Sequence, residues 1–446
     1  MGRRLFSFLL LVVFAGSAQA AEPVRVMVLD GPIDFSHPAL QESVWRNPDE
    51  IPSNRFDDDG NGVMDDVSGW NFHTDTPVLF DPLQIGSEEY PRVLETLRLL
   101  SEYEREQLGV LDGIHLLSLL RTVPLPRYVS LIHGTHVAGI LARTSDAVAL
   151  VGATLPQRSL LLPSSTQVAD GTRMFSDEEI ATEVEYYLGA ERRFYRQLAS
   201  YILASGVRVV NCSFGISEPA LRASLRTRHG HLSEEELGRI VEELVDGEAA
   251  MLTDFILGLQ EVLFVVAAGN EGRDLADGAQ LPATLDLGNV ITVAALDPEL
   301  RLAEFSNYGK VDVDLAAPGT TIESTVPGNA QASLSGTSMA VPQVSAVAAA
   351  VIAANPALSP VSVIHILNGT VDELPWLADK VTSGGMLNPA RAVNAARHAD
   401  PSQAMGTAVE AAFREVPASI PEPPSPRQKR LNASRVVETV LNLMRR

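Results

Sequence analysis

Residues 334–342, which read Leu-Ser-Gly-Thr-Ser-Met-Ala-Val-Pro, form the stretch of this chain with the clearest chemical potential. Gly336 permits a sharp turn, and residues 344–352 are apolar on all faces, which is typical of a buried helix. A serine at the start of such a helix lies beside free backbone N–H groups, where negative charge on a reacting oxygen is stabilised. Ser338 is therefore a candidate nucleophile. The alternative is a plain helix cap, because serine is a favoured N-cap residue.

A nucleophilic serine needs a base, and the base needs a group that orients it. His133 lies in the run HGTHVAG, where we expect a loop to enter an apolar helix, and Asp30 ends an apolar strand. In this combination Ser338 would attack a carbonyl, His133 would take its proton, and Asp30 would fix the imidazole tautomer. Asn270, in the run AAGNEG, would donate its side-chain amide to the oxyanion.

The elements that position these residues follow from apolar periodicity. Near-continuous apolar runs alternate with segments of helical pattern, and they lie at residues 24–29, 208–212, 262–267, 290–294 and 311–315. This alternation predicts an α/β fold in three layers, a mostly parallel, doubly wound sheet with helices on both faces. Ligands bind at the carboxyl ends of such strands. Because Asp30, Ser213 and Asn270 all follow strand ends, we expect them at one edge.

The chain divides into three predicted parts. Residues 1–20 carry two arginines, an apolar run and Ala18-Gln19-Ala20, the pattern of a secretory signal cleaved near Ala20. Residues 21–398 are expected to form one large domain with helical insertions near 78–127, 170–203 and 217–259. Residues 399–446 are expected to form a proline-rich linker and a short basic helix. The protein is thus predicted to be secreted or periplasmic.

Charge and composition narrow the partners. The net charge is −22, and it becomes −24 when Arg3 and Arg4 leave with the signal. This balance disfavours nucleic acid and anionic membranes as partners, and the apolar run of the signal is too short to span a bilayer. We expect the basic C-terminal tail to dock on the acidic body. The alternatives are a tail that stays disordered or one that lies on an anionic membrane surface. Cys212 is the single cysteine, so no intrachain disulfide is possible.

Several sequence blocks around these residues, in the order Asp, His, Ser, resemble the subtilisin-like serine proteases. They are VMVLDGPID around Asp30, HGTHVAG around His133, VVNCSFG around Ser213, AAGNEG around Asn270 and SGTSMAVP around Ser338. The resemblance implies an exported serine endopeptidase that cleaves peptide bonds through an acyl-enzyme on Ser338. It also implies a backbone edge that pairs with an extended protein or peptide substrate, made of Ser213, Phe214, Gly215, Ala268 and Gly269.

Some residues depart from the family pattern. Gly31 follows Asp30 where relatives usually carry serine or threonine, so one hydrogen bond that orients Asp30 is expected to be missing. Val341 and Gln343 replace the residues that usually follow the nucleophile. These departures leave an alternative function, in which a weakly active or inactive relative binds a protein partner in the substrate cleft.

A second candidate site lies in the acidic run DDDGNGVMDD, at residues 57–66. Oxygen ligands at alternating positions, with glycines that allow a tight wrap, suit calcium. We predict that its ligands are Asp57, Asp59, Asn61 and Asp65. The segment that contains them resembles a calcium loop of some family members. The alternative is a polar surface turn.

Overall fold

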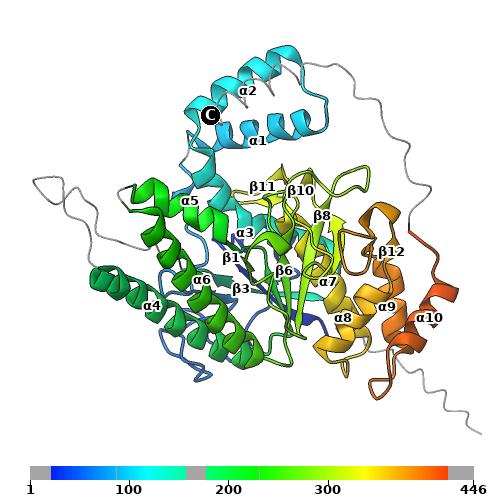
Figure 1. The fold of residues 1–446 in the computed structure, drawn as a ribbon. Coiled ribbons are helices and arrows are strands. Elements are labelled where there is room, and N and C mark those ends of the chain that lie inside the picture. Colours follow the sequence, from blue (N-terminus) through cyan, green and yellow to red (C-terminus); the bar gives the residue numbers. More distant parts are fainter. Residues whose placement is uncertain (1–21, 87, 157–176, 231, 420–446) are drawn as a thin grey trace, which may run out of the picture.

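The computed structural model describes residues 22–86, 88–156, 177–230 and 232–419. In these residues nine strands form one sheet in the order β12-β13-β9-β8-β6-β4-β1-β3-β2 (Figure 1). Neighbouring strands run parallel, apart from the antiparallel pair β12 and β13. The strands are β1 (Val24–Asp30), β2 (Gly69–Asn71), β3 (Val148–Thr154), β4 (Val209–Cys212), β6 (Leu263–Ala267), β8 (Val290–Leu296), β9 (Leu315–Pro318), β12 (Asp372–Glu373) and β13 (Gly385–Met386).

The sheet is buried on both faces, which explains why its strands read as continuous apolar runs. In β6, Phe264 and Val266 pack into one hydrophobic cluster, while Leu263, Val265 and Ala267 pack into a second cluster on the other face. The predicted three-layer α/β fold is confirmed.

Helices cover both faces of the sheet (Figure 1). One layer holds α4 (Asp177–Ala204), α5 (Glu218–Arg228) and α6 (Glu234–Leu257). The other holds α3 (Leu125–Thr144), α7 (Thr337–Ala354), α8 (Pro360–Gly369) and α9 (Pro389–His398). Two small sheets lie outside these layers, the pair β5 (Ile216–Ser217) with β7 (Gln280–Leu281) and the hairpin of β10 (Ile322–Val326) with β11 (Ala330–Leu334).

Two of the three segments predicted as insertions are part of the central α/β fold. The segments near 170–203 and 217–259 supply α4 and α6, which are the crossover helices of the sheet and not additions to it. Their apolar faces are buried against one side of the sheet, through residues such as Phe194 and Leu198 of α4 and Leu244 and Phe255 of α6. A long acidic outer face made these helices look peripheral in the sequence, whereas the buried inner face decides their role.

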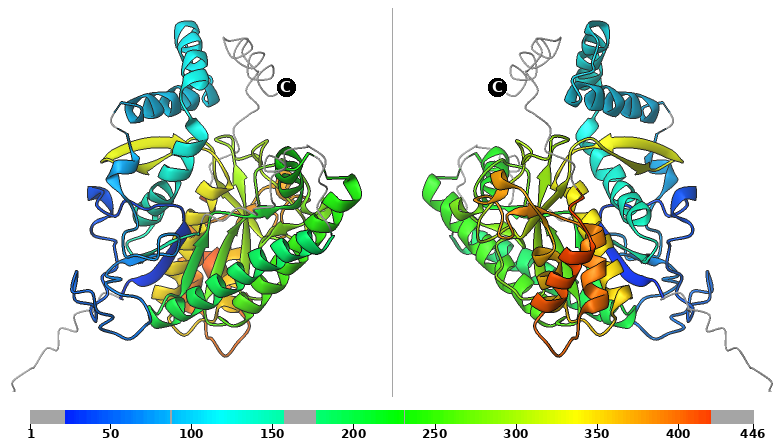
Figure 2. Two further views of the ribbon diagram at one scale, coloured as in Figure 1. Left: turned by 90° about the vertical axis from the view of Figure 1, so that its left-hand side faces the viewer. Right: turned by 90° about the vertical axis from the view of Figure 1, so that its right-hand side faces the viewer.

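The segment predicted as the first insertion, near 78–127, lies mostly outside the two helix layers. It contains α1 (Tyr90–Glu104) and α2 (Val110–Thr122), a helical hairpin that projects from the body (Figures 1 and 2). The hairpin has a small hydrophobic cluster of its own, which also takes in Tyr128 and Ile132 of α3 and Val326 and Ala332 of the β10–β11 hairpin.

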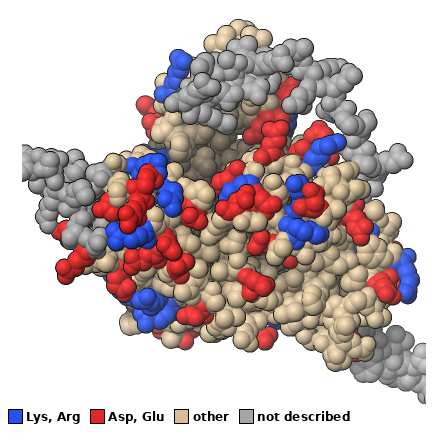
Figure 3. All heavy atoms as spheres, in the orientation of Figure 1, with Lys and Arg blue, Asp and Glu red and all other residues tan. Residues whose placement is uncertain are grey.

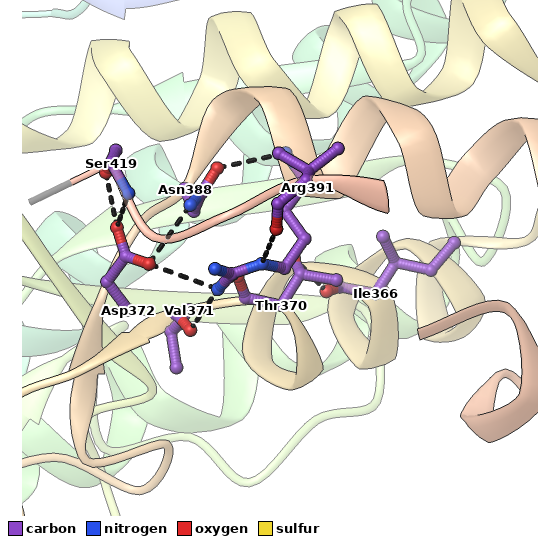
Figure 4. Close-up of polar contacts among 8 residues, drawn as sticks. Ile366, Thr370, Val371, Asp372, Asn388, Arg391 and Ser419 are labelled. Carbon is purple, nitrogen blue, oxygen red and sulfur yellow. Dashed lines mark hydrogen bonds and ion pairs between the residues drawn. The ribbon is translucent and has the colours of Figure 1, made fainter. Parts of the chain in front are cut away.

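The folded body continues past residue 398, the C-terminal boundary that the sequence predicts for the large domain. The helix α10 (Gly406–Glu415) packs on α9, and the chain after it is held by a buried ion pair between Asp372 and Arg391 (Figure 4). Asp372 accepts hydrogen bonds from the backbone N–H and hydroxyl of Ser419, and Arg391 donates to the carbonyl of Val416. The predicted linker and basic helix at 420–446, and the signal at 1–20, lie outside the described residues.

Among the described helices, α7 is the one that is long and apolar enough to cross a membrane, and 72% of its apolar window is buried inside the protein. It packs against β1, β4, β6, β8 and β9, as a central helix of this fold must. On the outer surface, acidic and basic side chains are interspersed over the face seen in Figure 3.

Candidate active site

The carboxyl end of β1 carries Asp30, which is buried, and α3 brings His133 against it. The Nδ1 atom of His133 lies 2.8 Å from Asp30 Oδ1 and 3.0 Å from Oδ2. A carboxylate at this distance fixes the proton on Nδ1, which leaves Nε2 as the basic nitrogen. Burial opposes the charged imidazolium, but the charge and hydrogen bond of Asp30 outweigh it and raise the pKa of His133.

The second histidine of the block serves the fold. His136 is fully buried, and its Nε2 faces the carbonyl of Ala332 in β11 at 3.1 Å. Burial, with the nearby His133, lowers the pKa of His136 to about 3. It is therefore neutral and donates to β11.

The helix that carries His133 begins earlier than the sequence indicated. We expected a loop at the histidine, but α3 begins at Leu125, so His133 lies well inside the helix. The added turns bring the carbonyl of Ser130 against Gly31, where a Cβ atom would lie 2.8 Å from that oxygen. The backbone N–H of Gly31 donates to Asp30 Oδ1 at 2.6 Å. Glycine is thus the residue that fits this helix, and Asp30 still receives a hydrogen bond from position 31.

We expect Gly31→Ser to lower activity, although it restores the residue type usual in relatives. The new Cβ would collide with a backbone oxygen of α3 and displace His133 three residues further along, and a misplacement of about 1 Å can cost about 10²-fold in rate. Turnover of a peptide substrate measures the effect. Gly238→Ser is a matched control, because an added Cβ on that glycine of α6 meets no atom within 4 Å. A gain in activity for Gly31→Ser would show that Asp30 lacks a hydroxyl donor.

Ser338 lies in the first turn of α7, and the simple capping role is excluded. The N-cap residue is Gly336, and the Ser338 hydroxyl donates to the carbonyl of Ser213 at 3.0 Å. Pro342 has no N–H, so the Ser338 carbonyl lacks its helical partner four residues on. The Ser213 hydroxyl takes that place and donates to the Ser338 carbonyl at 3.0 Å. Among the described residues, no hydrogen bond joins Ser338 Oγ to His133.

Asn270 follows β6, and hydrogen bonds from Thr337 orient its side-chain amide. Its side-chain oxygen accepts from the backbone N–H of Thr337 at 2.9 Å and from the Thr337 hydroxyl at 3.1 Å. The carbonyl end is therefore committed to the loop before Ser338, which leaves the NH₂ end to donate elsewhere. Gly269 has φ of 102°, and a Cβ there would lie 2.4 Å from the Asn307 amide, so this loop requires glycine.

The two segments predicted to bind substrate follow the carboxyl ends of β4 and β6. These strands pair in parallel, with Cys212 beside Val266, so Ser213 to Gly215 and Ala268 to Gly269 leave the sheet side by side. Gly215 is exposed and Phe214 is half-buried. A backbone that is exposed at Gly215 and outside the sheet can pair with a peptide strand if it is extended by the substrate.

The acidic loop forms a different cluster from the one we predicted. Glu50, Asp59 and Asp66 each place a carboxylate oxygen within 4.8 Å of the others, and Glu50 and Asp66 are buried. Burial and the nearby Asp59 and Glu50 carboxylates raise the pKa of Asp66. In the described part of the chain, no Lys or Arg forms an ion pair with any of the three.

Of the four predicted ligands, only Asp59 belongs to this cluster. The Asp65 carboxylate accepts from the backbone N–H groups of Asn54 and Arg55, and Asp57 accepts from those of Asn61 and Gly62, so both hold turns. Asn61 donates its side-chain amide to Asp59 and Asp66. The residue of the run that could have been chosen is its last aspartate, Asp66, which lies three positions before the buried strand β2, whereas Glu50 lies outside the run.

Serine hydrolases use the residue types found at this edge of the sheet: a histidine–aspartate pair, a serine at a helix start and an amide donor. A profile of the subtilase family matches residues 126–398. The chain therefore belongs to the subtilase family. Asp30 and the acidic loop precede the matched residues.

Individual proteins are similar to this chain over part or most of its length. Subtilisin-like protease 1 of Plasmodium vivax is 26% identical over 399 residues, which cover 85% of this chain and 48% of that protease. Subtilisin BL of Lederbergia lenta is 30% identical over 242 residues, which cover 54% of this chain and 71% of that protein. A solved structure, the A-subunit of the AB5 toxin from E. coli, is 19% identical with a TM-score of 0.48, over 84% of this chain and 93% of that one. The chain spans about half the length of the Plasmodium proteases that it matches. Family membership supports a serine-protease function.

Proposed function

We propose that this protein is an exported serine endopeptidase that hydrolyses peptide bonds through an acyl-enzyme on Ser338. The observation that carries the proposal is the 2.8 Å hydrogen bond between Asp30 and His133, which gives a buried sheet edge an oriented base. Within the family, this arrangement serves a serine nucleophile, and Ser338 begins the central helix at the same edge.

The proposed reaction uses these groups in sequence. A peptide lies along the backbone at Ser213 to Gly215, and Ser338 Oγ leaves its hydrogen bond to Ser213 by rotation about its Cα–Cβ bond. As Oγ attacks the substrate carbonyl carbon, its proton passes to His133 Nε2. Asp30 stabilises the imidazolium so formed, consistent with the raised pKa of His133.

The oxyanion would be bound by the Ser338 backbone N–H and by the Asn270 NH₂ group, whose orientation is set by Thr337. His133 then gives its proton to the leaving amine, and the C–N bond breaks. In the second half, His133 takes a proton from water, the resulting hydroxyl attacks the acyl group, and Ser338 Oγ leaves with that proton.

Labelling by a fluorophosphonate tests this proposal, since only an activated serine reacts readily with it. Mass spectrometry should place the label on Ser338. An unlabelled, folded protein would favour the alternative, a relative that uses the cleft to bind a protein partner.

We also propose that the acidic loop binds calcium, through Glu50, Asp59 and Asp66. Among the described residues, these three carboxylates converge without a Lys or Arg partner. Carboxylates are the hard oxygen donors that calcium takes, so these residues fit the ion better than the set predicted from the sequence. Bound calcium would neutralise the buried charge of Glu50 and Asp66 and fix the loop before β2.

Calcium is expected to raise the thermal unfolding midpoint, because it would bind the folded loop only. A free concentration of 100 times the dissociation constant adds about 2.7 kcal/mol to the free energy of unfolding. Asp66→Asn should remove most of the calcium-dependent shift, whereas Asp49→Asn, an exposed residue outside the cluster, should retain it. A midpoint that a chelator leaves unchanged in the wild type would refute the assignment.

A further inference from the structure

The projecting helix α1 reaches the loop that carries Ser338. At its C-terminal end, the Glu104 carboxylate accepts a hydrogen bond from the Ser335 hydroxyl at 2.5 Å. Ser335 lies three residues before Ser338 and one before the N-cap of α7. A helix that looked like an appendage in the sequence therefore contacts the nucleophile loop directly.

The Ser335 hydroxyl is held from two sides. It accepts from the Thr321 backbone N–H at 2.8 Å and donates to Glu104. Next to it, Arg105 of the α1 C-cap donates to the Thr321 carbonyl at 3.4 Å and to the Ser333 hydroxyl at 3.3 Å. The C-terminal end of α1 therefore contacts Thr321, just before β10, and Ser333, in the strand β11 that leads to the Ser338 loop.

The opposite end of α1 is fixed to the helix that carries His133. The hydroxyl of Tyr128 in α3 donates to the Glu89 carboxylate at the α1 N-cap at 2.8 Å. The Tyr90 hydroxyl donates to the Pro327 carbonyl at the tip of the β10–β11 hairpin at 2.7 Å. Ile132, the neighbour of His133, packs in the same hydrophobic cluster as Tyr90. The helix α1 therefore connects α3, which carries His133, to the loop that precedes Ser338.

From this connection we propose that Glu104 is a positioning residue, which holds the Ser338 loop in register with His133 through Ser335. The inference rests on the proposed function, because it assumes that Ser338 and His133 react together. A hydrogen bond to an ionised carboxylate is stronger than a neutral one, and α1 is anchored at its far end, so the bond restrains the loop against a rigid support. Without it, the Thr321 N–H is the one partner that the described residues leave to the Ser335 hydroxyl, and the loop gains freedom just before the reacting oxygen.

Two other hydrogen bonds of the loop, both made by backbone amides, give a direct readout of its position. The Gly336 N–H donates to the Gly319 carbonyl at 2.8 Å, and the Thr337 N–H donates to Asn270 Oδ1 at 2.9 Å. Hydrogen exchange of these two amides reports whether the loop is held, and it does not depend on catalysis. The rate of fluorophosphonate labelling of Ser338 reports the consequence for reactivity.

The experiment compares four single variants and one double variant of the full chain with the wild type. Glu104→Ala and Ser335→Ala each remove one partner of the bond, and Glu104→Gln keeps an oxygen acceptor of the same length. Glu102→Ala is the matched control, since that residue lies on the same helix and bonds Arg98 on the surface. Glu104 is more than a third exposed, although partial burial raises the pKa of its carboxyl, so its replacement leaves no core cavity and the fold should persist.

We expect Glu104→Ala and Ser335→Ala each to speed exchange of the Gly336 and Thr337 amides and to slow labelling about tenfold. Glu104→Gln should stay within about twofold of the wild type, and Glu102→Ala should not differ from it. The double variant Glu104→Ala/Ser335→Ala should be no slower than the slower single variant, because both changes remove one bond.

The proposal would be overturned if Glu104→Ala showed the same amide exchange and labelling rates as the wild type. It would also be overturned if the labelling rate of the double variant fell by the product of the two single-variant factors. A wild-type protein that fails to react with the fluorophosphonate contradicts the proposed function instead. In that case amide exchange in Glu104→Ala still tests whether the bond holds the loop: faster exchange shows that it does, and unchanged exchange shows that it does not.

Discussion

Replacing His133 or Ser338 by alanine is expected to lower peptide hydrolysis by roughly 10⁶-fold, a magnitude known from subtilisin. His133→Ala removes the base, and Ser338→Ala removes the atom that would form the acyl-enzyme. Since the residues act as a unit, the double variant should lose little more than either single variant. Turnover and fluorophosphonate labelling measure the loss.

Both variants should remain folded, which makes the result interpretable. Ser338→Ala removes one hydrogen bond, to the Ser213 carbonyl, and leaves the Ser213 hydroxyl bonded to the backbone of residue 338. His133→Ala leaves Asp30 with the Gly31 N–H as donor. A double variant far slower than both single variants, with unchanged unfolding midpoints, would contradict a shared role of the two side chains.

Arg391→Met is expected to lower the free energy of unfolding by about 3–5 kcal/mol, the usual cost of breaking a buried ion pair from one side. Arg391 and Asp372 are almost fully buried, with their charged atoms 3.1 Å apart (Figure 4). The change leaves the Asp372 carboxylate without its cation and removes the donor to the Thr370, Val371 and Val416 carbonyls. Thermal or denaturant unfolding measures the shift.

Arg414→Met is the matched control, because Arg414 pairs with Glu410 on the exposed face of α10. An exposed pair of this kind contributes about 0–1 kcal/mol. The double variant Asp372→Asn/Arg391→Met should recover part of the loss, since no buried charge then lacks a partner. If Arg391→Met unfolds like Arg414→Met, the ion pair does not hold the segment up to Ser419 on the body.

The sequence by itself determined the sheet and the chemical types at its edge. Strands buried on both faces must be apolar throughout, so β1, β4, β6 and β8 could be predicted locally. Asp30 and Asn270 could be assigned to one edge because parallel strands place their carboxyl ends together. Local rules suffice where a side chain's role depends on its own strand or turn.

Tertiary structure decided the features that depend on distances between separate segments. Glu50 joins Asp59 and Asp66 only because the chain folds back on itself, whereas Asp65 turns to backbone N–H groups. The fit of Gly31 depends on Ser130, a residue of α3. Likewise, nothing in the sequence pairs Glu104 with Ser335, 231 positions apart. Periodicity reports which face of a helix is apolar, but not which element covers it or what its polar end contacts.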